Sequence, residues 1–280
     1  MIGPDIFSVE PWAVTERELH LDLLAQTESI MALSNGQIGL RGNLDEAEPI
    51  GIPGTYLNGF YEIRPLPHAE AAYGDPEAGQ TMINVTNGKL IRLLVDDEPF
   101  DLRYGTLVRH ERTLDLRAGV LRRDVEWTSP TGQGVRVRST RLVSFTQRAV
   151  AAICYEVEPL GDGARIVVQS ELVANEPLVE GDGDDDPRAA AALRAPLVAE
   201  QHTHARLQAD LVHRTQASGL RMAAGMDHVV DGPAETVTTA HSEPDLARVT
   251  VSTRLQPGQR LRVVKMLAYG WSTAVAALAA

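Results

Sequence analysis

The sequence predicts a mainly β protein whose antiparallel strands form two packed sheets. From Tyr56 onward, short runs of β-branched and aromatic residues are separated by Gly, Pro, Asn and Asp, as in chains with many strands. Several runs alternate apolar and polar residues with a period of two, which gives a strand one buried face. Because helical signals are few and strands are many, the spacing indicates two sheets packed face to face.

The first strands that the alternation predicts lie in the first half of the chain. A tight turn at residues 96–99 joins the apolar runs on either side of it. Residues 113–116 and 120–127 form a predicted hairpin with Gly119 at the bend. In residues 135–139 the valines point to one face and the arginines to the other, so this strand is half-buried.

A second hairpin is predicted near the end of the chain. Residues 249–253 and 261–265 both have a two-residue period, and residues 256–259 between them have the composition of a turn. The simplest interpretation pairs these two strands directly.

Helical signals occur in two places. Residues 181–193 are typical of an acidic loop that runs into a short helix, inserted between strands. Aspartates at alternate positions of this loop mimic the start of a calcium site, but Leu193 stands where the bidentate Glu is required, so we interpret it as a solvated loop. At residues 272–280 a capping hydroxyl precedes an alanine-rich run, which predicts a short helix.

Composition restricts the class of protein. The 280 residues are 44% hydrophobic and 23% charged, which supports a packed core, and no repeat or Pro/Ser-rich linker divides the chain. A formal net charge of -12 disfavours nucleic acid and anionic membrane as partners. With no signal peptide and one cysteine, Cys154 in an apolar run, we expect a cytoplasmic protein with a core thiol. The high Arg to Lys ratio is typical of a GC-rich bacterial source.

No pattern predicts catalysis or metal binding in this chain. There is no G-x-S-x-G nucleophile motif. His202 and His204 share a strand face, but no third ligand accompanies them, so we interpret them as solvent-facing. The arginines of residues 103–148 alternate with apolar residues, which favours a polar sheet face or a subunit contact over nucleic-acid binding.

The candidate functional segment is residues 34–43. Its glycines, three apart, lead into further strand rather than a helix, so they are not a dinucleotide-binding fingerprint. Two roles are open for this segment: a tight, braced turn, or a loop that presents donors to a hydroxyl-rich ligand. The residues that carry either role are Asn35, Gly36, Arg41, Gly42 and Asn43.

The same region resembles a known family. Residues 28–43 read E-S-I-M-A-L-S-N-G-Q-I-G-L-R-G-N, which is similar to the E-S-L-F-x-x-x-N-G-x-x-G-x-R-G-N segment near the start of glycoside hydrolase family 65. Residues 12–14, 53–62, 90–93 and 98–101 match the family at family-like spacing. The chain departs from the pattern at residue 31, which is Met, and at residue 37, which is Gln.

The resemblance implies an antiparallel two-sheet β super-sandwich over residues 1–271. Residues 272–280 would then begin a helical linker to an α/α toroid that holds the family's general acid and phosphate-binding residues. The family contains maltose, trehalose and kojibiose phosphorylases and related hydrolases. The full-length protein is therefore expected to be an enzyme that cleaves an α-linked glucosyl disaccharide with inorganic phosphate or water.

For this chain alone, the resemblance implies no catalytic residue, metal or cofactor, and no activity. Domains of this type help to form a homodimer, and their loops approach the active-site entrance, where Asn35, Arg41 and Asn43 would reach a sugar. The competing hypothesis is a stand-alone carbohydrate-binding or assembly module without chemistry.

Overall fold

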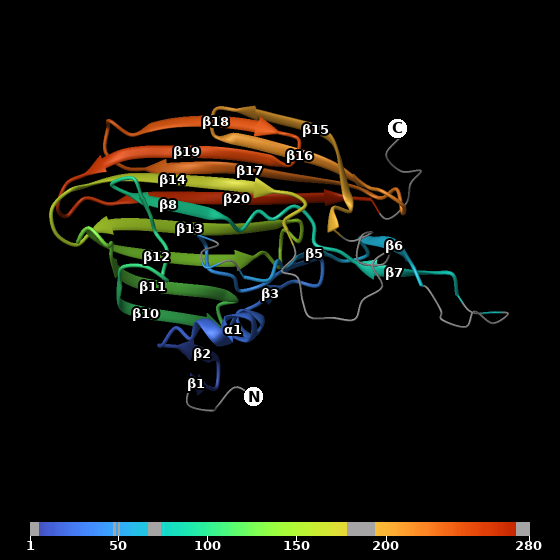
Figure 1. Cartoon of the computed structure of the whole chain (residues 1–280), viewed down its shortest axis with the longest axis horizontal. Helices are drawn as coiled ribbons and strands as arrows, with labels where there is room; N and C mark the ends of the chain where they lie inside the picture. Colours follow the sequence, from blue (N-terminus) through green and yellow to red (C-terminus); the bar gives the residue numbers. More distant parts are fainter. Residues whose placement is uncertain are drawn as a thin grey trace.

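Alternating side chains build two sheets that share one interior, as the computed structural model shows (Figure 1). The structure describes residues 6–46, 49, 51–66, 74, 76–177 and 194–272. The prediction of a mainly β, antiparallel sandwich is confirmed. The predicted acidic loop and helix at residues 181–193 and the predicted helix after residue 272 lie outside the described residues.

The larger sheet has ten antiparallel strands in the order β1-β2-β10-β11-β12-β13-β20-β17-β16-β15. Their bounds are β1 Phe7–Glu10, β2 Ala13–Glu16, β10 Thr106–Asp115, β11 Val120–Thr128, β12 Gly134–Val143, β13 Val150–Pro159, β15 Leu197–Ala205, β16 Gln208–Thr215, β17 Arg221–Asp231 and β20 Leu261–Trp271.

The second sheet has five strands in the order β18-β19-β14-β8-β9 and covers the inner face of the first. Its strands are β8 Ile91–Val95, β9 Glu98–Pro99, β14 Ala164–Val173, β18 Val237–Glu243 and β19 Leu246–Leu255. Smaller elements complete the fold: β3 Leu33–Ser34, β4 Ile38–Leu40 and β5 Thr55–Leu57 in one sheet, β6 Tyr61–Pro65 and β7 Ala78–Met82 in another, and the helical turns η1 Leu21–Leu23 and α1 Leu24–Ile30.

Two apolar clusters fill the space between these layers. One joins the two main sheets, where Ile153 and Val263 of the large sheet pack with Val168 and Val251 of the smaller one. The other lies where β3, β4 and β5 cover the large sheet. β12 and β13 bury alternate side chains, as the two-residue period requires, whereas β14 of the second sheet also buries consecutive ones.

The first predicted hairpin and the predicted turn are confirmed. β10 pairs with β11, with Leu114 opposite Leu121. Gly119 in the bend has a φ of 67°, a conformation that favours glycine. Asp96 and Asp97 form the turn between β8 and β9.

The second predicted hairpin is wrong. β19 pairs with β14 and β18, whereas β20 pairs with β13 and β17 in the opposite sheet. Residues 256–259 therefore form a corner between the two layers, and Val251 and Val263 face each other across the interior. A hairpin and such a corner have the same local alternation and turn chemistry, so long-range pairing decides between them.

The expectation that Cys154 is a core thiol is also wrong. In β13 the buried positions are Ala151, Ile153 and Tyr155, and Cys154 is half-buried on the outer face, where its Sγ accepts a hydrogen bond from Arg262 Nε at 3.3 Å. Because Cys154 has apolar neighbours on both sides, the sequence does not show which side chains of this strand face inward.

None of the helices among the described residues combines the length and the apolar character that crossing a bilayer requires.

The opposite orientations of Ile153 and Cys154 predict opposite sensitivities to truncation. We expect Ile153→Ala to lower the free energy of unfolding by about 2–5 kcal/mol, because it leaves a cavity between the sheets. Cys154→Ala, one residue further, should change it by less than about 0.5 kcal/mol. Chemical denaturation of both variants measures the difference; equal losses would contradict the assigned strand orientation.

Candidate functional site

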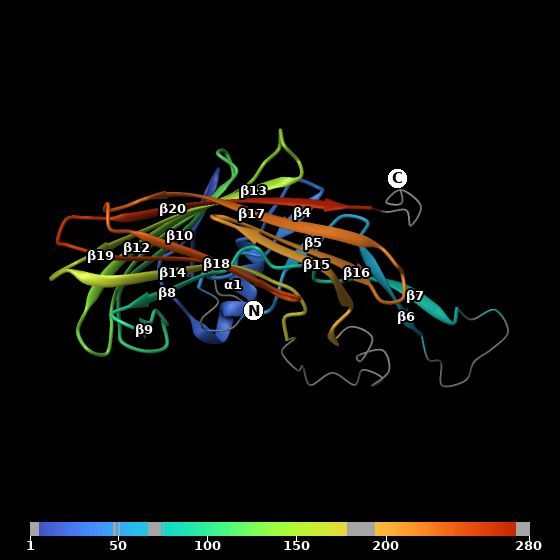
Figure 2. The ribbon, with the colours of Figure 1, turned by 90° about the horizontal axis from the view of Figure 1, so that it is seen from above.

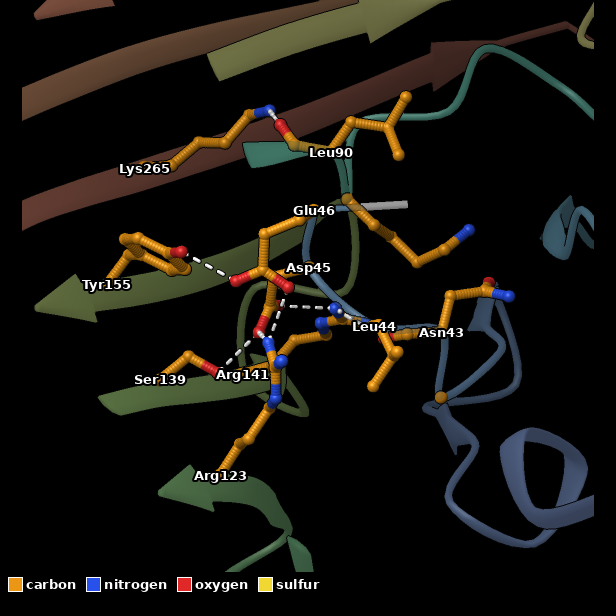
Figure 3. Close-up of polar contacts among 12 residues, drawn as sticks. Asn43, Leu44, Asp45, Glu46, Leu90, Arg123, Ser139, Arg141, Tyr155 and Lys265 are labelled. Atoms are coloured by element: carbon orange, nitrogen blue, oxygen red, sulfur yellow. Dashed lines mark hydrogen bonds and ion pairs between the residues drawn. The ribbon is translucent and has the colours of Figure 1, made fainter. Parts of the chain in front are cut away.

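The five candidate residues are divided between two places in the fold. Asn35 and Gly36 form the turn between β3 and β4, and Arg41, Gly42 and Asn43 continue beyond β4 alongside α1. From there the chain runs between the sheets as far as Glu46 (Figure 3). The sequence-predicted residues are thus neighbours in sequence but do not form one cluster.

Asn35 uses its whole side chain to fix its turn. Its Oδ1 accepts hydrogen bonds from the backbone N–H groups of Gln37 and Ile38, both at 2.9 Å. Its Nδ2 donates to the carbonyls of Ser144 and Arg148, at 2.7 and 2.9 Å. The β3–β4 turn is therefore tied to the turn between β12 and β13, more than 100 residues away in sequence.

The two glycines of the site serve different needs. Gly36 has a φ of 82°, which side chains rarely adopt. A Cβ on Gly42 would lie 2.4 Å from Met31 Cβ, so only glycine lets the chain pass this close to the end of α1. Both positions require glycine through backbone geometry, whichever ligand the protein binds.

Arg41 and Asn43 bond mainly to α1. Arg41 Nη2 donates to the carbonyl of Ala25, and its Nε lies 3.5 Å from Glu28 Oε2. Asn43 Nδ2 donates to Glu28 Oε2 at 2.8 Å and to the carbonyl of Ile52 at 3.0 Å. Asn43 Oδ1 has no hydrogen-bond partner among the described residues.

Glu28 is the acceptor that organises this half of the site, and it is not among the five residues predicted from the sequence. Its carboxylate also receives the Leu44 N–H at 3.4 Å, and its carbonyl receives the Gly42 N–H at 2.9 Å. Burial raises the pKa of Glu28, and the nearby Arg112 and Arg41 only partly oppose that rise. Its place at the start of the family-like segment was the available signal.

Two acidic residues follow the segment and are buried by the large sheet (Figure 3). Asp45 accepts hydrogen bonds from Arg141 Nη2 and Ser139 Oγ, both at 2.6 Å. Burial raises the pKa of Asp45, but the guanidiniums of Arg141 and Arg123 outweigh it, so the pKa lies below its usual range. Asp45 is therefore held ionised inside the domain.

Glu46 has a different balance. It accepts hydrogen bonds from Arg123 Nη1 and from the Tyr155 hydroxyl, both at 2.6 Å. Burial outweighs the attraction of Arg123, and the neighbouring Asp45 adds repulsion, so the pKa of Glu46 is raised.

A third buried ion pair, between Arg112 of β10 and Glu16 of β2, also holds the segment. Arg112 Nε donates to Glu16 at 2.5 Å, its Nη1 donates to the Gly42 carbonyl at 2.9 Å, and its Nη2 donates to Thr27 Oγ1 at 3.0 Å. Although burial alone would raise the pKa of Glu16, hydrogen bonds from His110 and Arg112 lower it to about 2.

These contacts correct the expectation for the arginine-rich region. Arg136 and Arg138 lie on the outer face of the sheet with acidic partners, as a polar face requires. Arg112, Arg123 and Arg141 instead point inward and are 1–4% exposed. They hold internal carboxylates and backbone carbonyls, so they are not part of a polar outer face.

A cleft opens beside Asn43 and Glu28, in the half of the site that contacts α1. Asn43 and Glu28 contribute to one wall, and Asn87 and Glu176, whose side chains share a 2.9 Å hydrogen bond, contribute to another. The remaining lining residues are Leu44, Pro49, Gly51, Ile52, Pro53, Leu90, Arg92, Val173 and Pro177. Most of the lining is apolar, and its amide and carboxylate groups are bonded to one another, Asn43 to Glu28 and Asn87 to Glu176.

His202 and His204 lie exposed on β15, as predicted. Their Nδ1 atoms are 3.1 and 2.9 Å from Ser242 Oγ. Within the part of the chain that the structure describes, no three His, Cys, Asp or Glu side chains are grouped so that they could hold a metal ion.

Comparison with known proteins agrees with the family resemblance of residues 28–43. The profile of the glycosyl hydrolase family 65 N-terminal domain matches residues 14–280. An uncharacterized glycosyl hydrolase of Mycobacterium tuberculosis is 61% identical over 273 residues, which are 98% of this chain and 34% of the relative. An alpha,alpha-trehalose phosphorylase of Thermoanaerobacter brockii is 31% identical over 269 residues, 94% of this chain and 34% of that enzyme.

A solved structure assigned as a kojibiose phosphorylase from the human microbiome has the same fold. It superimposes with a TM-score of 0.82 at 20% identity over 97% of this chain and 34% of that chain. The chain thus spans about a third of the length of the relatives it matches.

The contacts of Arg41 predict a loss of stability on truncation. Arg41→Ala should lower the free energy of unfolding by about 2 kcal/mol, because the buried Glu28 carboxylate and the Ala25 carbonyl lose a donor whose side chain is 17% exposed. Arg138→Ala on the outer face is the matched control and should have little effect. An unchanged melting temperature of Arg41→Ala, together with a raised KM for sugar in the full-length protein, would support the ligand-facing role instead.

The lowered pKa of Glu16 predicts an acid limb in the stability profile, which is a fall in the free energy of unfolding at low pH. The ionised carboxylate stabilises the fold fully above pH 4.5, and this contribution is lost as the pH falls toward 2. Glu16→Gln should therefore cost about 3 kcal/mol at pH 7 and flatten the profile below pH 4.5. Urea unfolding at a series of pH values measures this.

Glu28→Gln is the control for that experiment. The pKa of Glu28 is raised, so this substitution should alter the profile above pH 4.5 and leave the acid limb in place. An acid limb that persists unchanged in Glu16→Gln would contradict the assignment.

Proposed function

This chain belongs to glycosyl hydrolase family 65 as its N-terminal domain, and we propose that it is the non-catalytic part of an enzyme that cleaves an α-linked glucosyl disaccharide with phosphate or water. The observation that carries the proposal is its likeness, over 94% of its length, to an alpha,alpha-trehalose phosphorylase. Partial matches to maltose and kojibiose phosphorylases support the same class of substrate.

The geometry of the acidic residues supports a non-catalytic role. Glycosidic cleavage requires two carboxyl groups that flank an accessible bond. Glu16, Glu28, Asp45 and Glu46 are each no more than 2% exposed, and each is hydrogen-bonded within the domain. They cannot approach a sugar from both sides without leaving these partners.

In this proposal the two halves of the site have different roles. Arg41, Gly42 and Asn43 brace the interior against α1, and the Asn35–Gly36 turn, with Gly36 exposed, is the part that reaches the active-site entrance of the full-length enzyme. We further propose that the full-length enzyme is a homodimer and that this domain contributes to its interface.

The full-length protein should release glucose from trehalose, maltose or kojibiose. Assays with and without inorganic phosphate distinguish phosphorolysis, which stops without phosphate, from hydrolysis, which continues. The 280-residue chain, assayed in parallel, should leave all three sugars intact. Turnover by that chain, abolished by a substitution within it, would overturn the non-catalytic role, and inactivity of the full-length protein on all α-linked glucosyl disaccharides would overturn the proposed substrate class.

A further inference from the structure

Turns from distant parts of the sequence meet at one end of the large sheet. The Leu116 N–H donates to the Trp12 carbonyl at 2.9 Å, which joins the β10–β11 and β1–β2 turns. A Cβ on Gly119 would lie 3.8 Å from Phe145, which places the β12–β13 turn next to them. In Figure 2 the turns after β10 and β12 project from the same edge of the large sheet.

The functional segment and the end of β20 belong to this same end. Asn35 binds the carbonyls of the β12–β13 turn, as described above. The Tyr269 N–H donates to the Ala149 carbonyl at 2.9 Å, and Trp271 Nε1 donates to the Asn58 carbonyl at 3.0 Å. The polypeptide therefore leaves β20 beside these turns.

Three large apolar side chains are exposed on the contacting turns. Trp12 is 60% exposed, Leu116 54% and Phe145 69%. Single exposed apolar residues are ordinary, but a group on adjoining turns marks an interaction surface. Trp and Phe are enriched where protein surfaces dock.

We propose that Trp12, Leu116 and Phe145 form the face on which the polypeptide that follows Trp271 docks in the full-length protein. This inference rests on the proposed function in so far as it requires that longer protein. Matched relatives are about three times as long as this chain, so a large body of protein must be accommodated next to it. The end of β20 brings that body to the same end of the sheet as the three side chains.

The composition of the face favours protein over sugar as its occupant. Sugar-binding platforms depend on flat aromatic rings accompanied by polar donors. Here an aliphatic side chain, Leu116, accompanies the two aromatic ones, and the nearby Arg122 is already paired with Asp115 at 2.6 Å. Apolar anchors of mixed shape fit the buried core of a protein interface.

Photo-crosslinking in the full-length protein tests the proposal. A benzophenone amino acid replaces Phe145 in one variant, Trp12 in a second and Tyr104 in a third. Tyr104 is the matched control, because it is 61% exposed but precedes β10, at the opposite end of that strand. Denaturing gels and peptide mapping identify the attachment points after illumination.

We expect the probes at positions 145 and 12 to attach within the same chain, beyond residue 280, with a yield several-fold higher than the probe at 104. A cross-link between two chains would place a second copy on this face and overturn the proposal. Attachment to an added oligosaccharide, or no attachment to protein, would overturn it as well. Disaccharide cleavage is measured separately, so a protein that cross-links as expected but cleaves no sugar contradicts the proposed function alone.

Discussion

Three inward-facing guanidiniums on neighbouring strands hold the functional segment inside this domain. Arg112 of β10 lies directly opposite Arg123 of β11, and Arg141 projects from β12. Like charges so close on one sheet face repel, so the arrangement requires carboxylates between them. Glu16, Asp45 and Glu46 supply these, while the backbone carbonyls of residues 41–43 accept further hydrogen bonds from Arg112 and Arg141. The path of the segment and the pairing of three strands therefore depend on each other.

Much of the fold could be predicted, because the two-residue period directly reports which side chains face inward. The same period also indicates an inward-facing arginine, which the interpretation of this region as a polar face overlooked. Val135, Val137 and Arg141 are in phase, so the alternation that buries the valines also buries the arginine. The pairing of β19 and β20 could not be predicted, because a hairpin and a corner between sheets share local chemistry and differ only in long-range contacts.

For the candidate site, sequence similarity located the right segment but not its division into two parts. The partners that separate Asn35 from Asn43 are a turn more than 100 residues away and a glutamate on α1. The local sequence pattern shows neither of these two contacts. The departure from the family at Met31 also becomes understandable, because this side chain is fully buried in the apolar cluster, next to Gly42, where unbranched methionine fills irregular space.

The four acids around the segment differ because burial and the nearby guanidiniums act on each of them in different proportion. Four carboxylates, those of Glu16, Glu28, Asp45 and Glu46, face the four guanidiniums of Arg41, Arg112, Arg123 and Arg141, and burial foremost lowers the pKa of His110, which therefore adds no charge near neutrality. Lys89 and Lys265, whose pKa values burial lowers to about 7, donate to backbone carbonyls and a hydroxyl rather than to these acids. Where burial outweighs the attraction of the nearby guanidiniums, a buried carboxyl group is stabilised by keeping its proton. Glu16 is hydrogen-bonded by His110 and Arg112, and Asp45 lies beside two guanidiniums, so their pKa values are lowered. Burial outweighs the guanidiniums at Glu28 and Glu46, whose pKa values are raised.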